Sequence, residues 1–190
     1  MGAKWAPCQH CEMEIFAIEN FDEYSKAVAD GKPVRSFLVD IHAEPERAVR
    51  IWETTVGKNT PWQDTVVRIS SAGIEMLGTV VWFDGPDELF SAIVPVIDEY
   101  LSTGSSAASV YGMPSDVSLS AIGGGAAKLC LGEKEGFIIN PSLFLLDMAK
   151  EIDRYLEWKA VWLGRHTVGY EDISVKDLLV RLEEACGLRS

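Results

Sequence analysis

The sequence predicts an α+β protein in which mixed, largely antiparallel sheets pack against about five helices. Three observations support this class. Short alternating or β-branched apolar segments typical of strands occur in both halves, beside longer segments with apolar residues at helical spacing. Residues 65–70 and 76–83 flank Ala72-Gly73 and are most simply an antiparallel strand pair. Of the 190 residues, 47% are hydrophobic, which is ample for a core that folds unaided.

Capping and helix-breaking residues set the ends of the helices expected in the first half. Asn20 or Asp22 can cap the first helix, which Gly31 ends. Pro45 suits the first turn of the second helix, and Pro95 should kink the third or mark its effective start. In chain order, the expected elements are a strand at residues 14–19, the first helix, a strand at residues 36–41, the second helix, strands at residues 65–70 and 76–83, and a third helix reaching residue 101.

A change in composition divides the chain. Residues 102–115 are small and polar, and we expect them to link two halves packed as one compact unit. Residues 1–103 form an acidic N-terminal α/β half, and residues 104–190 form a half that is first β and then helical. The elements expected after the linker are strands at residues 117–121, 128–131 and 137–139, a helix at residues 141–163 and a last helix at about residues 175–186.

Two helical segments resemble each other. Residues 85–101 and 140–156 align without gaps, share a proline and the ending Ile-Asp-X-Tyr-Leu, and each follows predicted strands. One interpretation is two related halves, each with a ββα unit, in a pseudo-twofold arrangement. Convergence of two amphipathic helices explains five identities in 17 positions about equally well.

The charge of the chain is strongly negative and uneven. It holds 17 Lys and Arg against 29 Asp and Glu, a formal net charge of −12. Such a chain repels phosphate backbones and anionic lipids, so we expect no direct nucleic-acid or membrane binding. Residues 1–103 hold 8 basic and 17 acidic residues, so this half carries most of the negative field. The field either steers a basic partner or serves solubility alone.

The expected location is the cytoplasm. No apolar run approaches the length of about 20 residues that spans a bilayer, and the first residues lack the apolar region of a signal peptide. Four cysteines are too few for a disulfide scaffold in a chain of this size, so reduced thiols are expected.

The segment Cys8-Gln9-His10-Cys11 has the spacing of half a zinc site. The sequence contains no second CxxC pair, so a site would need further ligands brought by folding or by a second chain. A thioredoxin-type motif is excluded, because no core strand precedes Cys8. We expect an inert N-terminal arm and no cofactor, with zinc as the weaker alternative.

The segment Asp40-Ile41-His42 resembles the first metal motif of calcineurin-like phosphoesterases. That chemistry needs further histidines and a second Asp cluster, and the chain has three histidines only. The G-x-S-x-G elbow of serine hydrolases and the complete phosphate-loop patterns are also missing. Asp40 and His42 are therefore expected to end a strand at the surface.

Aromatic and acidic residues around the second helix favour a protein-binding surface. Trp62 lies in a polar turn with no reason to be buried, and exposed aromatics beside carboxylates are typical of binding hot spots. We expect a non-catalytic inhibitor or immunity-type protein that docks on a basic partner. The predicted partner-binding residues are Trp62, Glu44, Glu46, Glu53 and Asp64.

The competing hypothesis is a small enzyme or ligand-binding domain. Its site would lie between the halves, near His42 or His166 and the glycine-rich segment 123–125. A deep pocket that places one of these histidines beside a carboxylate would favour this alternative. The sequence does not indicate the oligomeric state.

Overall fold

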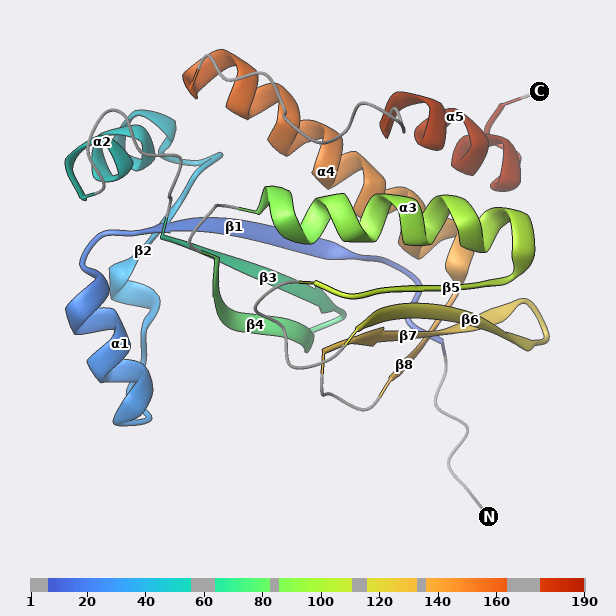
Figure 1. The fold of residues 1–190 in the computed structure, drawn as a ribbon, viewed down its shortest axis with the longest axis horizontal. Coiled ribbons are helices and arrows are strands. Elements are labelled where there is room, and N and C mark those ends of the chain that lie inside the picture. Colours follow the sequence, from blue (N-terminus) through green and yellow to red (C-terminus); the bar gives the residue numbers. More distant parts are fainter. Residues whose placement is uncertain are drawn as a thin grey trace.

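A computed structural model of the chain describes residues 7–55, 64–82, 86–110, 116–132, 136–163 and 175–189. Within these ranges, five α-helices accompany two four-stranded antiparallel sheets (Figure 1), so the predicted α+β class is confirmed. The elements in chain order are β1 (Glu12–Ile18), α1 (Phe21–Ala29), the 3₁₀ turn η1 (Arg35–Phe37), β2 (Leu38–Asp40), α2 (Pro45–Thr55), β3 (Thr65–Ser71), β4 (Ile74–Trp82), α3 (Asp87–Thr103), β5 (Ser105–Ala108), β6 (Val117–Gly123), β7 (Ala126–Leu131), β8 (Phe137–Ile139), α4 (Pro141–Leu163) and α5 (Val175–Ala185).

Both sheets have four antiparallel strands, but their strand orders differ. The first has the strand order β2-β1-β3-β4 and the second the order β5-β6-β7-β8, and all neighbouring strands are antiparallel. The second sheet is a simple meander, because β5 to β8 pair in chain order. In the first sheet, β1 lies between β2 and β3, so the chain passes through α1, β2 and α2 before β3 pairs with β1. A helix follows the last strand of each sheet.

The helix that follows the last strand of each sheet packs on the other sheet. α3 follows β4 but contacts β5 and β6 of the second sheet, whereas α4 follows β8 but contacts β1 of the first. At matching positions of the aligned segments, Ile97 and Ile152 are both buried. One continuous core cluster therefore contains residues from both halves of the chain.

The segment before β1 also connects the sheets. The backbone N–H of Cys8 donates to the carbonyl of Ile138 at 2.8 Å, and the N–H of Asn140 donates to the carbonyl of Cys8 at 2.8 Å. Cys8 thus forms a parallel bridge beside β8, while β1 lies inside the first sheet. The expected N-terminal arm is docked along the second sheet at this point.

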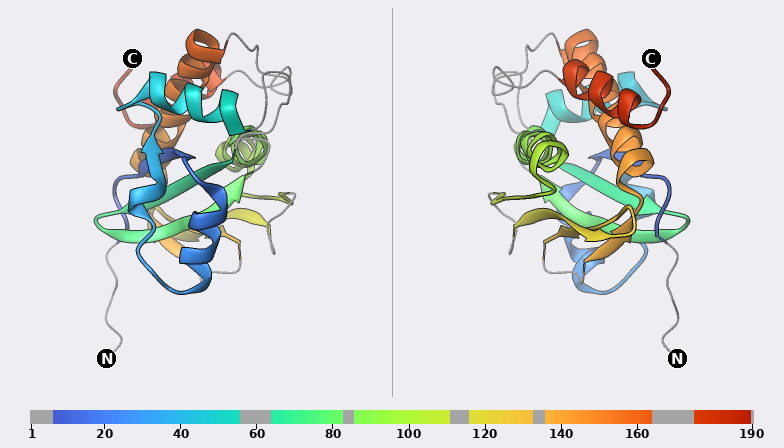
Figure 2. Two further views of the ribbon diagram at one scale, coloured as in Figure 1. Left: turned by 90° about the vertical axis from the view of Figure 1, so that its left-hand side faces the viewer. Right: turned by 90° about the vertical axis from the view of Figure 1, so that its right-hand side faces the viewer.

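β1 is buried on both faces. Ile15 and Ala17 belong to the main core under α2, α3 and α4, whereas Phe16 and Ile18 belong to a second cluster with Tyr24 of α1. Helices α2 to α5 therefore lie on one side of the sheets and α1 on the other (Figures 1 and 2). Asn20 caps α1 as predicted, since its side chain accepts a hydrogen bond from the N–H of Glu23.

Three local predictions differ from the structure. Part of the expected linker is a strand, β5, because Gly104, with φ of 80°, reverses the chain and lets β5 pair with β6. Of the two effects expected of Pro95, a helix start at this residue is excluded, because α3 runs from Asp87 to Thr103 with Pro95 on its exposed side. The first residues of the expected strand at 36–41 form the turn η1.

A buried ion pair joins α3 to α4. Lys159 of α4 is 6% exposed and bonds to Asp87 in the first turn of α3. A buried ammonium is costly unless it is paired, so this contact fixes how the two crossing helices sit against each other.

Replacing Lys159 should therefore destabilise the fold. Lys159→Met removes the ammonium group that pairs with the part-buried carboxylate of Asp87, and we expect a loss of about 2–4 kcal/mol in the free energy of unfolding. Urea denaturation followed by circular dichroism measures this loss. Lys150→Met, at an exposed position of the same helix, is the control and should change stability by no more than about 0.5 kcal/mol. Equal stability of the two variants would contradict the role of the pair.

Candidate functional site

A side-chain cap turns the chain from β2 into α2. The carboxylate of Asp40 accepts hydrogen bonds from the backbone N–H groups of His42 and Ala43, at 2.8 and 3.0 Å. The carbonyl of Glu44 then accepts the first helical bond, from the N–H of Ala48. The Asp-Ile-His segment therefore shapes this turn.

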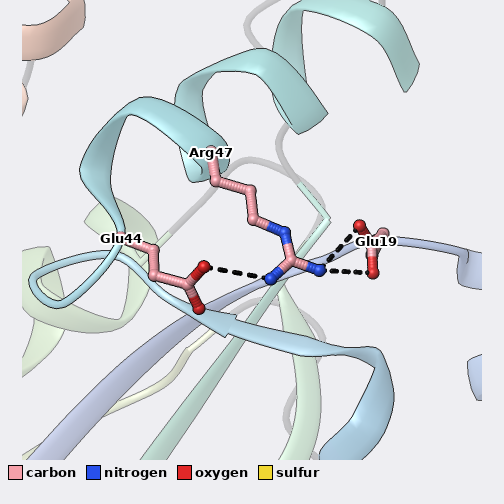
Figure 3. Close-up of polar contacts among 3 residues, drawn as sticks. All are labelled: Glu19, Glu44 and Arg47. Atoms are coloured by element: carbon pink, nitrogen blue, oxygen red, sulfur yellow. Dashed lines mark hydrogen bonds and ion pairs between the residues drawn. The ribbon is translucent and has the colours of Figure 1, made fainter.

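An arginine on α2 connects two glutamates from different elements. Arg47 Nη2 donates to both carboxylate oxygens of Glu19, each at 2.9 Å, and Nη1 donates to Oε2 of Glu44 at 3.0 Å (Figure 3). These hydrogen bonds, with that to Glu19 first, raise the pKa of Arg47 above its ordinary value. Glu19 follows β1, so the three side chains, named here the Glu19–Arg47–Glu44 triad, join the first sheet to the start of α2.

A surface pocket lies beside the triad, between the start of α2 and the end of α4. Its volume is about 360 Å³. Trp162, in the last turn of α4, is 39% exposed and forms one wall, and its neighbour Val161 is 77% exposed. The residues that line this α2–α4 pocket are Ala43, Glu44, Pro45, Glu46, Arg47, Arg50 and Trp162.

The predicted partner-binding residues are only partly gathered here. Glu44 and Glu46 line the pocket, and Glu53 is exposed two turns further along α2. Asp64 is half-buried at the start of β3 and is not a pocket residue; burial raises the pKa of its carboxyl group. Trp62 lies outside the described residues.

Trp162 was not among the predicted residues, although the sequence held a signal for it. Residues 160–163 read Ala-Val-Trp-Leu, and successive residues of a helix point about 100° apart. Four consecutive apolar residues at a helix end therefore cannot all face the core. Ala160, Val161 and Trp162 are exposed, and only Leu163 packs partly against the core.

The cysteine segment contributes to packing. Cys11 is buried in the main core, and Cys8 packs partly against it. His10 Nδ1 lies 2.8 Å from a carboxylate oxygen of Asp147 on α4, with 68% of the histidine side chain exposed. Within the described parts of the chain, no three His, Cys, Asp or Glu side chains are grouped so that they could hold a metal ion.

The structure describes some of the residues that the enzyme or ligand-binding hypothesis named. His42 is half-buried at the turn before α2, and burial lowers its pKa, with the charge of Arg154 acting in the same direction. His166 lies outside the described residues. The glycine-rich segment 123–125 joins β6 to β7 as a hairpin turn.

Cys11 should resist alkylation in the folded protein. Burial, together with the nearby charge of Asp147, raises the pKa of its thiol, so the thiolate that reacts with iodoacetamide is scarce at neutral pH. Mass spectrometry of peptides from native and urea-unfolded protein should find Cys11 modified only after unfolding. Equal rates in both states would show that this segment is open.

His42 should make stability depend on pH in a defined direction. Its pKa is lower in the folded protein than the ordinary 6.5, so the unfolded chain binds the proton more tightly. Stability should be lost as pH falls from 6.5 towards the lowered pKa. Urea titrations at several pH values should show a smaller loss over this interval for His42→Gln than for the wild type. The same pH slope in both proteins would contradict the lowered pKa.

Comparison of the chain with protein families, curated proteins and solved structures found no match. Function is therefore inferred from the side chains that the fold brings together. These are the triad and the α2–α4 pocket, where an exposed tryptophan lies beside two of the predicted glutamates.

Proposed function

We propose that this chain is a non-catalytic inhibitor or immunity-type protein that docks on a basic surface of a protein partner. The observation that carries this proposal is the α2–α4 pocket, in which Glu44 and Glu46 lie beside the exposed Trp162. A tryptophan offers a large apolar area for burial, while carboxylates around it orient a cationic partner.

The local charge supports a basic occupant. In the triad, two carboxylates face one guanidinium, which leaves one net negative charge. The pocket lining itself balances two glutamates, Glu44 and Glu46, against two arginines, Arg47 and Arg50. The net negative charge comes from carboxylates beside the pocket, Glu19 in the triad and the exposed Glu53 further along α2. The net charge of −12 on the whole chain adds a long-range attraction for basic proteins and disfavours nucleic acids and anionic membranes as partners.

We place this activity in the cytoplasm. Cys8, Cys11, Cys130 and Cys186 are free thiols, which fits a reducing compartment. In the described part of the chain, no helix has the length and apolar character needed to cross a bilayer.

Two substitutions should weaken binding for different reasons. Trp162→Ala removes the apolar anchor, and we expect an affinity loss of roughly tenfold or more. Glu46→Lys should cost roughly two- to fivefold, mainly by slowing association, with a smaller effect at high salt. Isothermal titration calorimetry and stopped-flow mixing measure both effects. The partner can be obtained through a photo-crosslinking amino acid placed at position 162 and then purified.

Matched controls separate a docking site from a general charge effect. Glu184→Lys makes the same charge change at an exposed position of α5, and a photo-crosslinker at Val28 samples the exposed side of α1. Glu184→Lys should bind the partner with the affinity of the wild type. The crosslinker at Val28 should capture no more partner than background. A partner that is not basic, or equal losses for Glu46→Lys and Glu184→Lys, would overturn the proposal.

A further inference from the structure

We infer that Arg47 is a positioning residue of the docking surface, which holds Glu19 and Glu44 as one acidic face for a cationic segment of the partner. This inference rests on the proposed function and adds a role that the charge of Arg47 does not suggest. An arginine inside an acidic binding surface would by itself repel a basic partner.

The geometry shows what Arg47 holds together. Glu19 follows β1 and Glu44 precedes α2, so their carboxylates come from separate elements. The three hydrogen bonds of 2.9, 2.9 and 3.0 Å from one guanidinium are the contacts that join them (Figure 3). Without the positive charge between them, two carboxylates at this spacing repel each other and their side chains would move apart.

Burial does not explain why these three side chains are held in one arrangement. The side chains of Arg47, Glu19 and Glu44 are 41%, 45% and 50% exposed. A planar guanidinium can hold such exposed carboxylates in place because its N–H groups form a rigid fork. Lysine carries the same charge on a single freely rotating ammonium group, so it cannot reproduce this arrangement.

The positioned carboxylate reaches the pocket. Glu44 and Arg47 both line the α2–α4 pocket, and Glu44 Oε1 accepts no hydrogen bond from the described residues. A partner guanidinium or ammonium group at the pocket would therefore meet an acceptor whose direction is already fixed. Fixing the acceptor before binding reduces the entropy that the complex must lose.

Arg50 provides a matched comparison. It lies on the next turn of α2 and lines the same pocket, but its side chain makes no ion pair with another described residue. Removal of either arginine changes the net charge by the same amount. Charge alone predicts that both removals strengthen binding of a cation, whereas positioning predicts opposite signs for the two sites.

The test uses the full chain and an octa-arginine peptide as the probe, with affinity measured by fluorescence anisotropy at low and at high salt. We expect Arg50→Met to bind the peptide roughly two- to threefold more tightly than the wild type. Arg47→Met should bind it roughly two- to fivefold more weakly. Arg47→Lys, which keeps the charge, should also bind more weakly. Circular dichroism confirms that each variant is folded.

The outcomes distinguish this inference from the proposed function. If the wild type binds the peptide and Glu46→Lys weakens that binding, the docking surface stands. The positioning role is then overturned if Arg47→Met binds as tightly as Arg50→Met, or if Arg47→Lys binds like the wild type. If the wild type does not bind the peptide, or Glu46→Lys has no effect, the proposed function fails and the inference fails with it.

A second measurement reports on positioning without any ligand. In the free wild type, nuclear magnetic resonance should show slow rotation of the Nη groups of Arg47, because both are held by carboxylates. The Nη groups of Arg50 should rotate fast. Glu19→Gln should speed the rotation at Arg47. Fast rotation at Arg47 in the wild type would overturn the positioning role even if the peptide binds.

Discussion

The structure depends on the exchange of two helices between two four-stranded sheets. α3 leaves the first sheet and packs on β5 and β6, and α4 leaves the second sheet and packs on β1. Because each sheet is covered partly by the helix of the other, the apolar residues of both halves merge in one core. The pair of Lys159 and Asp87 fixes the crossing of these two helices, since the buried ammonium of Lys159 is costly unless it is paired.

This exchange also creates the α2–α4 pocket, which we propose as the docking surface. α4 begins after the second sheet and runs back to the first, so that its last turn lies beside the start of α2 (Figures 1 and 2). Trp162, from the C-terminal half, thereby joins Glu44 and Glu46, from the acidic N-terminal half. This surface therefore results from tertiary packing. Within it, the hydrogen bonds of the triad hold exposed side chains that are not fixed by burial.

Local sequence patterns predicted the helices and strands better than they predicted which of these elements lie side by side. Proline, capping residues and helical periodicity placed the start of α4 at Pro141 and limited the cap of α1 to Asn20 or Asp22, because these signals act over a few residues. The structure has Asn20 as the cap. β5 was missed because its Ser and Ala residues carry no strand pattern, and backbone pairing with β6 alone defines it. Trp162 was missed at the site for a related reason: the sequence shows that a residue is exposed at a helix end, but not which distant segment lies beside it.

We propose that a cationic partner binds where α2 meets the end of α4. The chain has six tryptophans, and their indole N–H resonances provide separate probes during a titration with octa-arginine peptide. We expect the indole resonance of Trp162 and the backbone amides around Glu44 and Glu46 to shift together, while those of the buried Trp52 and Trp158 stay unchanged. Shifts confined to another face, with Trp162 unaffected at saturation, would contradict this proposal.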